Sequence, residues 1–167
     1  MSTDDSWKSL GQVNEWIRFA DAKATAVLAA SGVLGGLLVR SIPNVVEFKI
    51  HPARATLLSI AILCVGASAL ITLRTFAPRL RTGEARSLIY FDHVARRYAN
   101  DRPAFVDSYS SLTSSQERLT RELAEQIWAN SHVARRKFRR VSFAVRFLGL
   151  AMASSGVAVL VQRLWDI

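Results

Sequence analysis

The sequence has little of what builds a disulfide-linked, metal-binding or catalytic protein. It holds one cysteine among 167 residues, Cys64, and that residue lies in an apolar run, so neither disulfides nor a cysteine-based metal centre are expected. It contains no Walker-type phosphate loop, GxSxG, HExxH or paired His/Cys set. Its carboxylates Glu117, Glu122 and Glu125 lie on a charged helical face that indicates exposure to solvent. We predict a non-enzyme without a cofactor or a metal site.

Signals for secretion and for β-structure are also missing. The acidic and polar segment Met1–Leu10 does not have the pattern of a signal peptide, so any membrane insertion would use internal apolar segments. No strand-like alternation, internal repeat or low-complexity tract stands out. An all-α protein is predicted.

Apolar and charged residues are separated along the chain. Half of the residues are apolar and the mean hydropathy is +0.18, although the net charge is +9. The blocks Ala24–Val39, Leu57–Leu73 and Phe147–Val161 carry no charge. Each is slightly shorter than the ~18–20 residues typical of a membrane span. However, all three are apolar all round, whereas a helix of a soluble bundle keeps a polar stripe. We predict three transmembrane helices; a soluble bundle with three core helices is the alternative.

The longest predicted helix runs from Pro103 to Val161. Pro103 suits a first helical position, and Asp101 is close enough to cap it. At ~1.5 Å per residue this helix would be about 90 Å long, too long for a compact domain of this size. We therefore expect it to enter the membrane after the basic run Arg135–Arg140. Its apolar or neutral face consists of Phe105, Tyr109, Leu112, Gln116, Leu119, Leu123, Ile127, Asn130, Ala134, Phe138 and Val141.

The distribution of positive charge predicts the topology. Fifteen of the 22 Lys and Arg residues lie between Arg74 and Arg146, and cytoplasmic segments keep the excess of Lys and Arg. A helical hairpin, with a shorter helix between Pro78 and Asp101 as its first arm, would form the cytoplasmic part, and its second arm would continue into the last span. Trp165 would anchor the opposite interface. The predicted segments are a cytoplasmic N-terminal helix (1–23), the first span (24–39), an external loop (40–54), the second span (55–73), a cytoplasmic sensor region (74–140) and the third span (141–164).

Small residues in the spans favour close helix packing. Gly32 and Gly36 form a GxxxG pair, and Gly149 with Ala153 forms a similar one. Such spacing lets helix backbones approach closely in lipid. These small residues could pack against another helix of the same protomer or against a helix of a second protomer.

Three stretches together resemble a known family. NEWIRFADAKA (14–24) leads into the first span, LIYFDHVA (88–95) opens the middle region, and QIWANSHVARRK (126–137) precedes the last span. In this order they resemble the transmembrane effectors of Pycsar antiphage systems, over roughly residues 10–162. The resemblance implies a multi-pass protein of the bacterial inner membrane whose functional partner is a pyrimidine cyclase. It implies that cyclic CMP or cyclic UMP made by the cyclase activates the effector, which then impairs the membrane and stops growth. A membrane-disrupting role favours a homo-oligomer.

A cyclic pyrimidine nucleotide needs a cation for its phosphate, a flat partner for its base and polar groups for the edge of the base. Besides Tyr90, the aromatic residues Phe91 and Trp128 could stack on the base. Such aromatic residues lie more often in a protein core or in an interface. Arg135–Arg140 also has the composition of a juxtamembrane cluster that binds anionic lipid. His93 and His132 are expected to be ordinary polar residues. The predicted ligand-binding residues are Tyr90, Asp92, Arg96, Arg97, Gln126, Asn130, Arg135 and Lys137.

A second polar group lies near the start of the first span: Asn14, Asp21 and Lys23. An ionised Asp21 at this depth needs a partner, and Lys23 is on a different face of the helix. Lys137 or Arg139 would be suitable partners. The group would then form a latch that joins the first helix to the sensor and shifts when ligand binds. Simple solvation of Asp21 at the interface is the alternative.

Two other functions remain open at this point. A constitutive membrane scaffold would use its basic segment to bind lipid or a partner protein, without a nucleotide. A soluble DNA-binding bundle is less well supported, because Arg135–Arg140 has no helix-turn-helix context, and we predict no nucleic-acid partner. The sequence does not distinguish cyclic CMP from cyclic UMP. A Gln or Asn side-chain amide can be flipped to accept from the 4-amino group of cytosine or to donate to the 4-oxo group of uracil.

Overall fold

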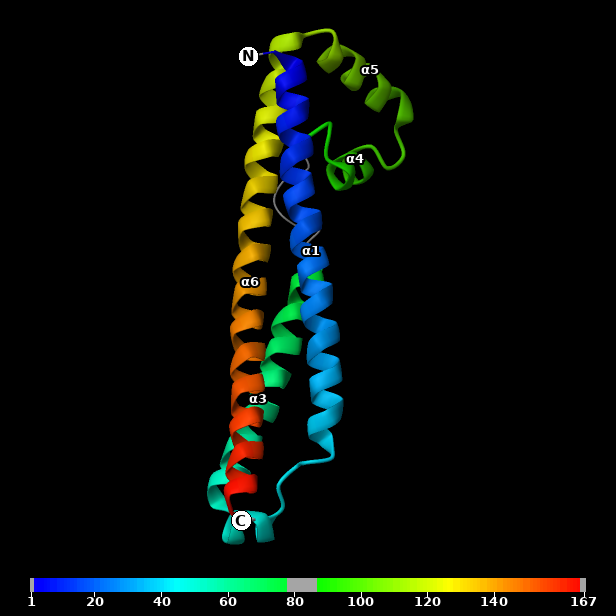
Figure 1. The fold of residues 1–167 in the computed structure, drawn as a ribbon. Coiled ribbons are helices and arrows are strands. Elements are labelled where there is room, and N and C mark those ends of the chain that lie inside the picture. Colours follow the sequence, from blue (N-terminus) through cyan, green and yellow to red (C-terminus); the bar gives the residue numbers. More distant parts are fainter. Residues whose placement is uncertain (1, 78–86, 166–167) are drawn as a thin grey trace. The chain divides into compact units, whose positions relative to one another are not determined.

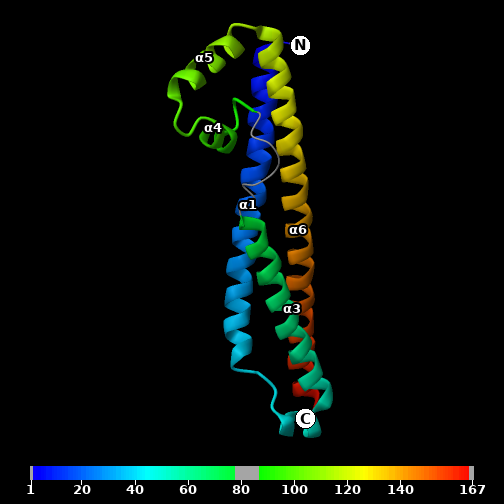
Figure 2. The ribbon, with the colours of Figure 1, turned by 180° about the vertical axis from the view of Figure 1, so that it is seen from behind.

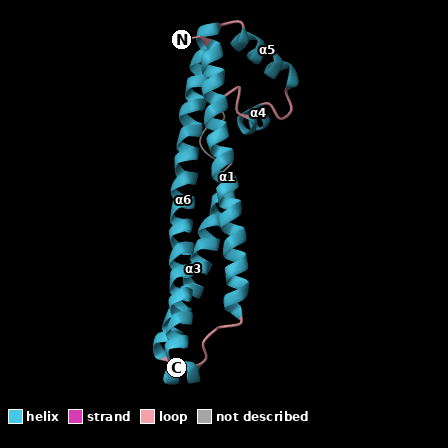
Figure 3. Cartoon of the chain, in the orientation of Figure 1, coloured by secondary structure: helices cyan, strands magenta, loops and turns pink. Residues whose placement is uncertain are grey.

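In the computed structural model, which describes residues 2–77 and 87–165, the described chain is helical and has no strand (Figure 3). This confirms the predicted all-α class. The helices are α1 (Thr3–Val39), α2 (Val45–Ile50), α3 (Pro52–Phe76), α4 (Phe91–Arg97), α5 (Arg102–Thr113) and α6 (Gln116–Trp165).

The two long helices, α1 and α6, both bury a seam with a period of 3.5 residues. Such a seven-residue repeat is the pattern of helices that pack nearly parallel and coil around each other. In α1 the buried and half-buried seam positions are Thr3, Ser6, Leu10, Val13, Ile17, Ala20, Ala24, Val27, Ser31, Leu34 and Leu38. In α6 they are Leu119, Leu123, Gln126, Asn130, Val133, Lys137, Arg140, Ala144, Phe147, Ala151, Ser154, Ala158 and Val161.

The long helix predicted from Pro103 is wrong in its first part, because the chain breaks at Ser114 and Ser115. The Thr113 hydroxyl donates to the carbonyls of Tyr109 and Ser110, at 3.1 Å each, and these bonds compete with regular helix geometry. The Ser115 hydroxyl then accepts from the Arg118 N–H at 3.4 Å, as an N-cap does. As a result α5 lies beside the start of α6 and not in line with it (Figure 1).

The described chain divides into two compact units. Unit 1 consists of Met1–Phe19 and Pro78–Arg136, and unit 2 consists of Ala20–Ala77 and Lys137–Ile167. Unit 1 therefore holds the beginnings of α1 and α6 together with α4 and α5. Unit 2 holds the ends of α1 and α6 together with α2 and α3.

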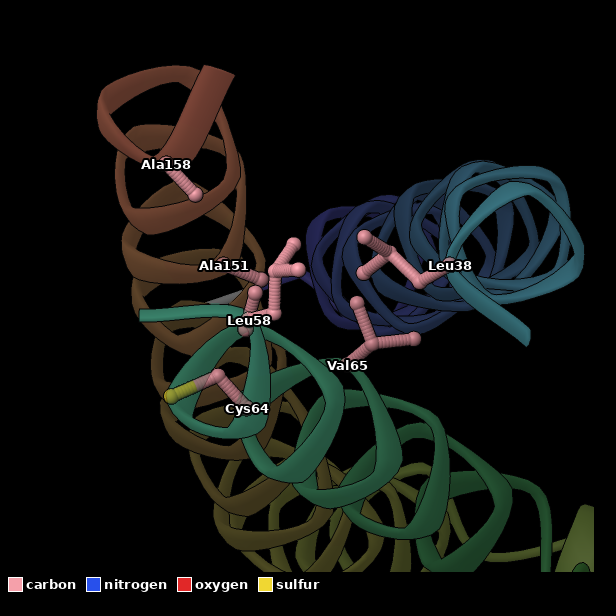
Figure 4. Close-up of a cluster of buried hydrophobic side chains, with 7 residues drawn as sticks. Leu38, Leu58, Cys64, Val65, Ala151 and Ala158 are labelled. Carbon is pink, nitrogen blue, oxygen red and sulfur yellow. The ribbon is translucent and has the colours of Figure 1, made fainter. Parts of the chain in front are cut away.

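Unit 2 is a bundle of three helices, in which α3 packs beside α1 and α6 (Figure 2). Its apolar core contains side chains from all three helices, as the close-up of Leu38, Leu58, Cys64, Val65, Ala151 and Ala158 shows (Figure 4). A chain of polar groups crosses this core. Ser31 and Ser68 share a hydrogen bond of 3.1 Å, and the Ser68 hydroxyl lies 2.9 Å from the carbonyl oxygen of Ala144. These contacts link the three helices at one level.

The glycines of α1 differ in their surroundings. A Cβ on Gly35 would lie 3.2 Å from Cγ1 of Val65 in α3, whereas a Cβ on Gly32 or Gly36 would meet nothing within 4 Å. The GxxxG pair Gly32 and Gly36 thus faces away from the described neighbours within the protomer, and the intervening Gly35 makes the close contact.

The helices α1, α3 and α6 are each long and apolar enough to cross a membrane, which confirms the three predicted transmembrane helices. Only 22%, 33% and 28% of their most apolar stretches are buried within the protomer. Large apolar side chains such as Leu37, Leu63 and Leu160 are exposed instead. A soluble bundle would bury these side chains, whereas in a bilayer they contact lipid. The chain is therefore a membrane protein.

The segments between the long helices differ in detail from the prediction. The predicted loop 40–54 contains α2, which Asn44 caps through its side chain, and α3 begins at Pro52, since proline loses no hydrogen bond at a first helical position. The shorter helix predicted between Pro78 and Asp101 is α4. The part of that predicted region from residue 78 to 86 lies outside the described residues.

Candidate ligand-binding site

The central feature of unit 1 is an exposed tryptophan on α6 between two arginines. Arg121, Trp128 and Arg135 follow one another at intervals of seven residues, so they lie on one face of the helix. The Trp128 side chain is 68% exposed, and the ring of His132 lies 4.4 Å from it in an edge-to-face arrangement. An exposed indole with a cation about two turns away on either side is suited to a flat, anionic ligand.

Two hollows border this tryptophan, and Ala124 and Trp128 line both. The first, of about 690 Å³, is also lined by Ser87, His93, Arg121, Glu125, Gln126 and Ala129. The second, of about 470 Å³, is also lined by Ser9, Ile127, Ser131, His132 and Arg135. Both volumes are in the range of small-molecule sites, ~300–1,000 Å³. Each hollow thus combines the Trp128 indole with one arginine.

A chain of amides connects the first hollow with α1. Nε2 of Gln126, which lines this hollow, donates to Oδ1 of Asn130 at 3.0 Å. Nδ2 of Asn130 in turn donates to Oδ1 of Asn14 at 2.8 Å. Thr3 and Thr120 share a further bond of 3.2 Å, so α1 and α6 run parallel in unit 1 with nearly constant register.

The predicted ligand residues in and next to α4 contact other side chains of the same segment. Nε of Arg96 lies 3.0 Å from Oδ2 of Asp92, and the Arg97 guanidinium lies 5.2 Å from the centre of the Tyr98 ring. The Tyr90 ring contacts the rings of Phe91 and His93, with centres 5.0 and 4.9 Å away. Tyr90, Asp92, Arg96 and Arg97 line neither hollow, so the structure does not bring them together with Gln126 and Arg135.

Lys137, predicted both as a ligand residue and as a partner of Asp21, lies in unit 2 and pairs with that aspartate. Its Nζ is 2.6 and 2.8 Å from the two oxygens of the Asp21 carboxylate. The Lys23 ammonium lies 5.7 Å from the centre of the Phe138 ring and so makes a separate contact between α1 and α6. All three residues of the polar group predicted at the start of the first span therefore have partners on α6: Asn14, Asp21 and Lys23.

Sequence reasoning missed two residues of the first hollow, Arg121 and His93. Nδ1 of His93 accepts a hydrogen bond of 3.2 Å from the backbone N–H of Ser87, which fixes the ring at the edge of the hollow. Arg121 lies seven residues before Trp128, so the heptad spacing would have indicated it. Nothing in the sequence places His93 beside α6.

Comparisons with known proteins show the family of this chain. The family model described as the Pycsar effector protein domain matches residues 5–162. The chain belongs to the Pycsar effector family. The Pycsar effector protein PtPycTM of Propioniciclava tarda is 33% identical over 171 residues, which cover 95% of this chain and 81% of that protein. The Pycsar effector protein MePycTM of Micromonospora echinofusca is 59% identical over 59 residues, 35% of this chain and the whole of that protein. No solved structure matches this chain.

Membership in the Pycsar effector family makes this protein an antiphage-defence effector linked to the cyclic nucleotide signal of a cyclase. The family is not a known enzyme family. Among the residues that the structure describes, no group of three or more His, Cys, Asp or Glu side chains is placed to hold a metal ion.

Proposed function

We propose that this Pycsar effector binds a cyclic pyrimidine nucleotide, cyclic CMP or cyclic UMP, on the Trp128 face of α6. The observation that carries the proposal is the combination of an exposed indole with an arginine in each adjoining hollow. The indole would stack on the pyrimidine, and Arg121 or Arg135 would pair with the single phosphate charge. The Gln126 amide would read the polar edge of the base.

The amide chain offers a route from this site to the membrane. A ligand that forms a hydrogen bond with the Gln126 amide would compete with the hydrogen bond from Gln126 to Asn130. Asn130 in turn donates a hydrogen bond to Asn14 of α1. One heptad further along each helix, Asp21 and Lys137 form their ion pair. We assign these pairs the role of a latch that fixes the register of α1 against α6 in the resting state. Its rearrangement would alter the three-helix bundle of unit 2 and impair the inner membrane.

The topology belongs to the same proposal. The excess of Lys and Arg between Arg74 and Arg146 supports a cytoplasmic N-terminus and a cytoplasmic middle region. Segments 24–39, 55–73 and 141–164 would then cross the bilayer, and 40–54 would lie outside. Assembly of several protomers, supported by the outward-facing Gly32 and Gly36, would disrupt the membrane more effectively than one protomer.

Calorimetry on the detergent-purified full-length protein tests the nucleotide site. We expect saturable binding of cyclic CMP or cyclic UMP and none of cyclic AMP or cyclic GMP. Trp128→Ala should weaken binding by about tenfold or more, as loss of a stacking contact does. Either Arg121→Gln or Arg135→Gln should have a similar effect through loss of a charge-assisted contact, which shows which arginine pairs with the phosphate. Arg136→Gln is the matched control, because Arg136 is an exposed neighbour in the same basic run that lines neither hollow.

Two results would contradict the proposal. If folded protein binds none of the four nucleotides, the constitutive membrane scaffold becomes the better account. If binding is pyrimidine-specific but insensitive to Trp128→Ala, Arg121→Gln and Arg135→Gln, the site lies elsewhere in the protein.

A further inference from the structure

A separate hollow lies in unit 2, where α3 begins and α6 ends. It has a volume of about 240 Å³ and is lined by His51, Pro52, Ala53, Arg54, Val161, Gln162 and Trp165. The rings of His51 and Trp165 meet edge to face with their centres 6.2 Å apart. Because α3 and α6 are both membrane-spanning candidates, this hollow lies where two spans end.

Apolar side chains around this end indicate that it is immersed in lipid. The short helix α2 packs against α3 and has no buried residue, and its Val45, Val46, Phe48 and Ile50 are exposed. Ile42, just before α2, is exposed as well. A short apolar helix between two spans is suited to the boundary between head groups and acyl chains. In a bilayer the hollow would therefore open at the depth of lipid head groups.

The polar groups of the hollow suit a phosphate. Arg54 supplies a guanidinium, and Trp165 supplies an indole N–H at the end of α6. The first turn of α3 contributes further donors, because His51 makes no side-chain cap and the first intrahelical bond shown there runs from Ala55 to His51. The backbone N–H groups of Ala53 and Arg54 precede that bond and lie at the positive end of the helix.

Glu47, the ion-pair partner of Arg54, offers a place for a cation beside the hollow, although it does not line the hollow itself. Nη1 of Arg54 lies 3.3 Å from Oε1 of Glu47, so the pair is neutral overall. The Glu47 side chain is 34% exposed, but its other carboxylate oxygen, Oε2, is enclosed and accepts no hydrogen bond from the residues that the structure describes. A buried acceptor without a partner is unfavourable, and a bound ammonium would satisfy it. A ligand with a phosphate and an N–H-bearing cation matches these groups better than a simple anion does.

We propose that this hollow binds the phosphoethanolamine head group of a membrane lipid. The phosphate would be held by Arg54, Trp165 and the first turn of α3, and the ammonium would donate to Glu47. Phosphatidylcholine lacks the N–H donors, and phosphatidylglycerol lacks the cation, so both fit less well. The lipid would tie the end of α6 to the beginning of α3.

Native mass spectrometry of the full-length protein tests this site. The protein, in detergent, is incubated with equal amounts of phosphatidylethanolamine, phosphatidylcholine and phosphatidylglycerol that have the same acyl chains. We expect preferential retention of phosphatidylethanolamine. Arg54→Gln should lower this retention by about tenfold, the effect of one charge-assisted hydrogen bond. Glu47→Gln should remove the preference over phosphatidylcholine. Arg40→Gln is the control, because Arg40 is an exposed arginine just after α1 that does not line the hollow.

Equal retention of the three lipids, or equal effects of Arg54→Gln and Arg40→Gln, would overturn the proposal. Displacement of the lipid by inorganic phosphate would also overturn it, since the site would then recognise phosphate alone. Trp165→Ala provides a second variant if Arg54→Gln does not fold, because Trp165 is exposed and at the end of its helix. Nucleotide binding in unit 1 should be unchanged in all of these variants, so the outcome is independent of the nucleotide site.

Discussion

The ion pair between Asp21 of α1 and Lys137 of α6 is suited to a double-mutant cycle. The variants are Asp21→Ala, Lys137→Ala and the combination of both. The lysine nitrogen lies 2.6 and 2.8 Å from the two carboxylate oxygens, so one cation serves both acceptors. The Lys137 side chain is 21% exposed and the Asp21 side chain 36%, which makes the pair half-buried.

The expected coupling free energy of the pair follows from this partial burial. Fully exposed ion pairs contribute ~0.2–1 kcal/mol, and breaking a fully buried pair costs ~3–5 kcal/mol. For a half-buried pair with short contacts we expect a coupling free energy of about 2 kcal/mol. In a protein of this size 1 kcal/mol changes the midpoint of thermal unfolding by ~2–4 °C. Each single variant should therefore lower the midpoint by about 4–8 °C, and the second substitution should add little.

Thermal unfolding of the detergent-purified variants measures these values. The control cycle uses Glu15 and Arg18, whose side chains are 75% and 80% exposed at a distance of 3.4 Å, and should give a coupling below about 0.5 kcal/mol. If the Asp21–Lys137 coupling is no larger than that of the control, the pair does not hold the two helices together. The latch in the proposed function would then lose its support at this level.

Three further substitutions test the packing. Ser68→Ala removes the buried hydroxyl that links three helices and should lower the free energy of unfolding by ~0.5–1.5 kcal/mol, measured by thermal unfolding. Ser59→Ala, which loses a hydrogen bond to Ala55 of its own helix, should cost less, and equal effects would contradict the link. Gly35→Ala should be about 1 kcal/mol less stable than Gly36→Ala, because its Cβ would lie 3.2 Å from Cγ1 of Val65, which would have to shift by a few tenths of an ångström. The reverse order would refute this packing. Ser115→Ala should lower the free energy of unfolding by ~0.5–2 kcal/mol, because it removes the side chain that caps the start of α6. Thermal unfolding measures this as well, and an unchanged midpoint would show that the cap contributes nothing.

The spans and one face of the longest helix were readable from the sequence, because both are local patterns. Most of the predicted face of the long helix is buried or half-buried, including Leu112, Leu123, Ala134 and Val141. The period of the pattern depends only on helix geometry, so no knowledge of the neighbours is needed. The break after Thr113 was missed, although the run of Ser and Thr around it is a local signal for a helix end.

Only the tertiary structure decided which residues meet. The sequence limited the partner of Asp21 to a few cations of one basic run, and the structure selected Lys137. It also distinguished Gly35 from Gly36, and it placed His93 beside Arg121 while leaving Arg96 with Asp92. Such pairings depend on the register and rotation of one helix against another. Register is set by the sum of all contacts along the seam, which a single sequence does not display, whereas helix formation and apolar character are properties of each segment alone.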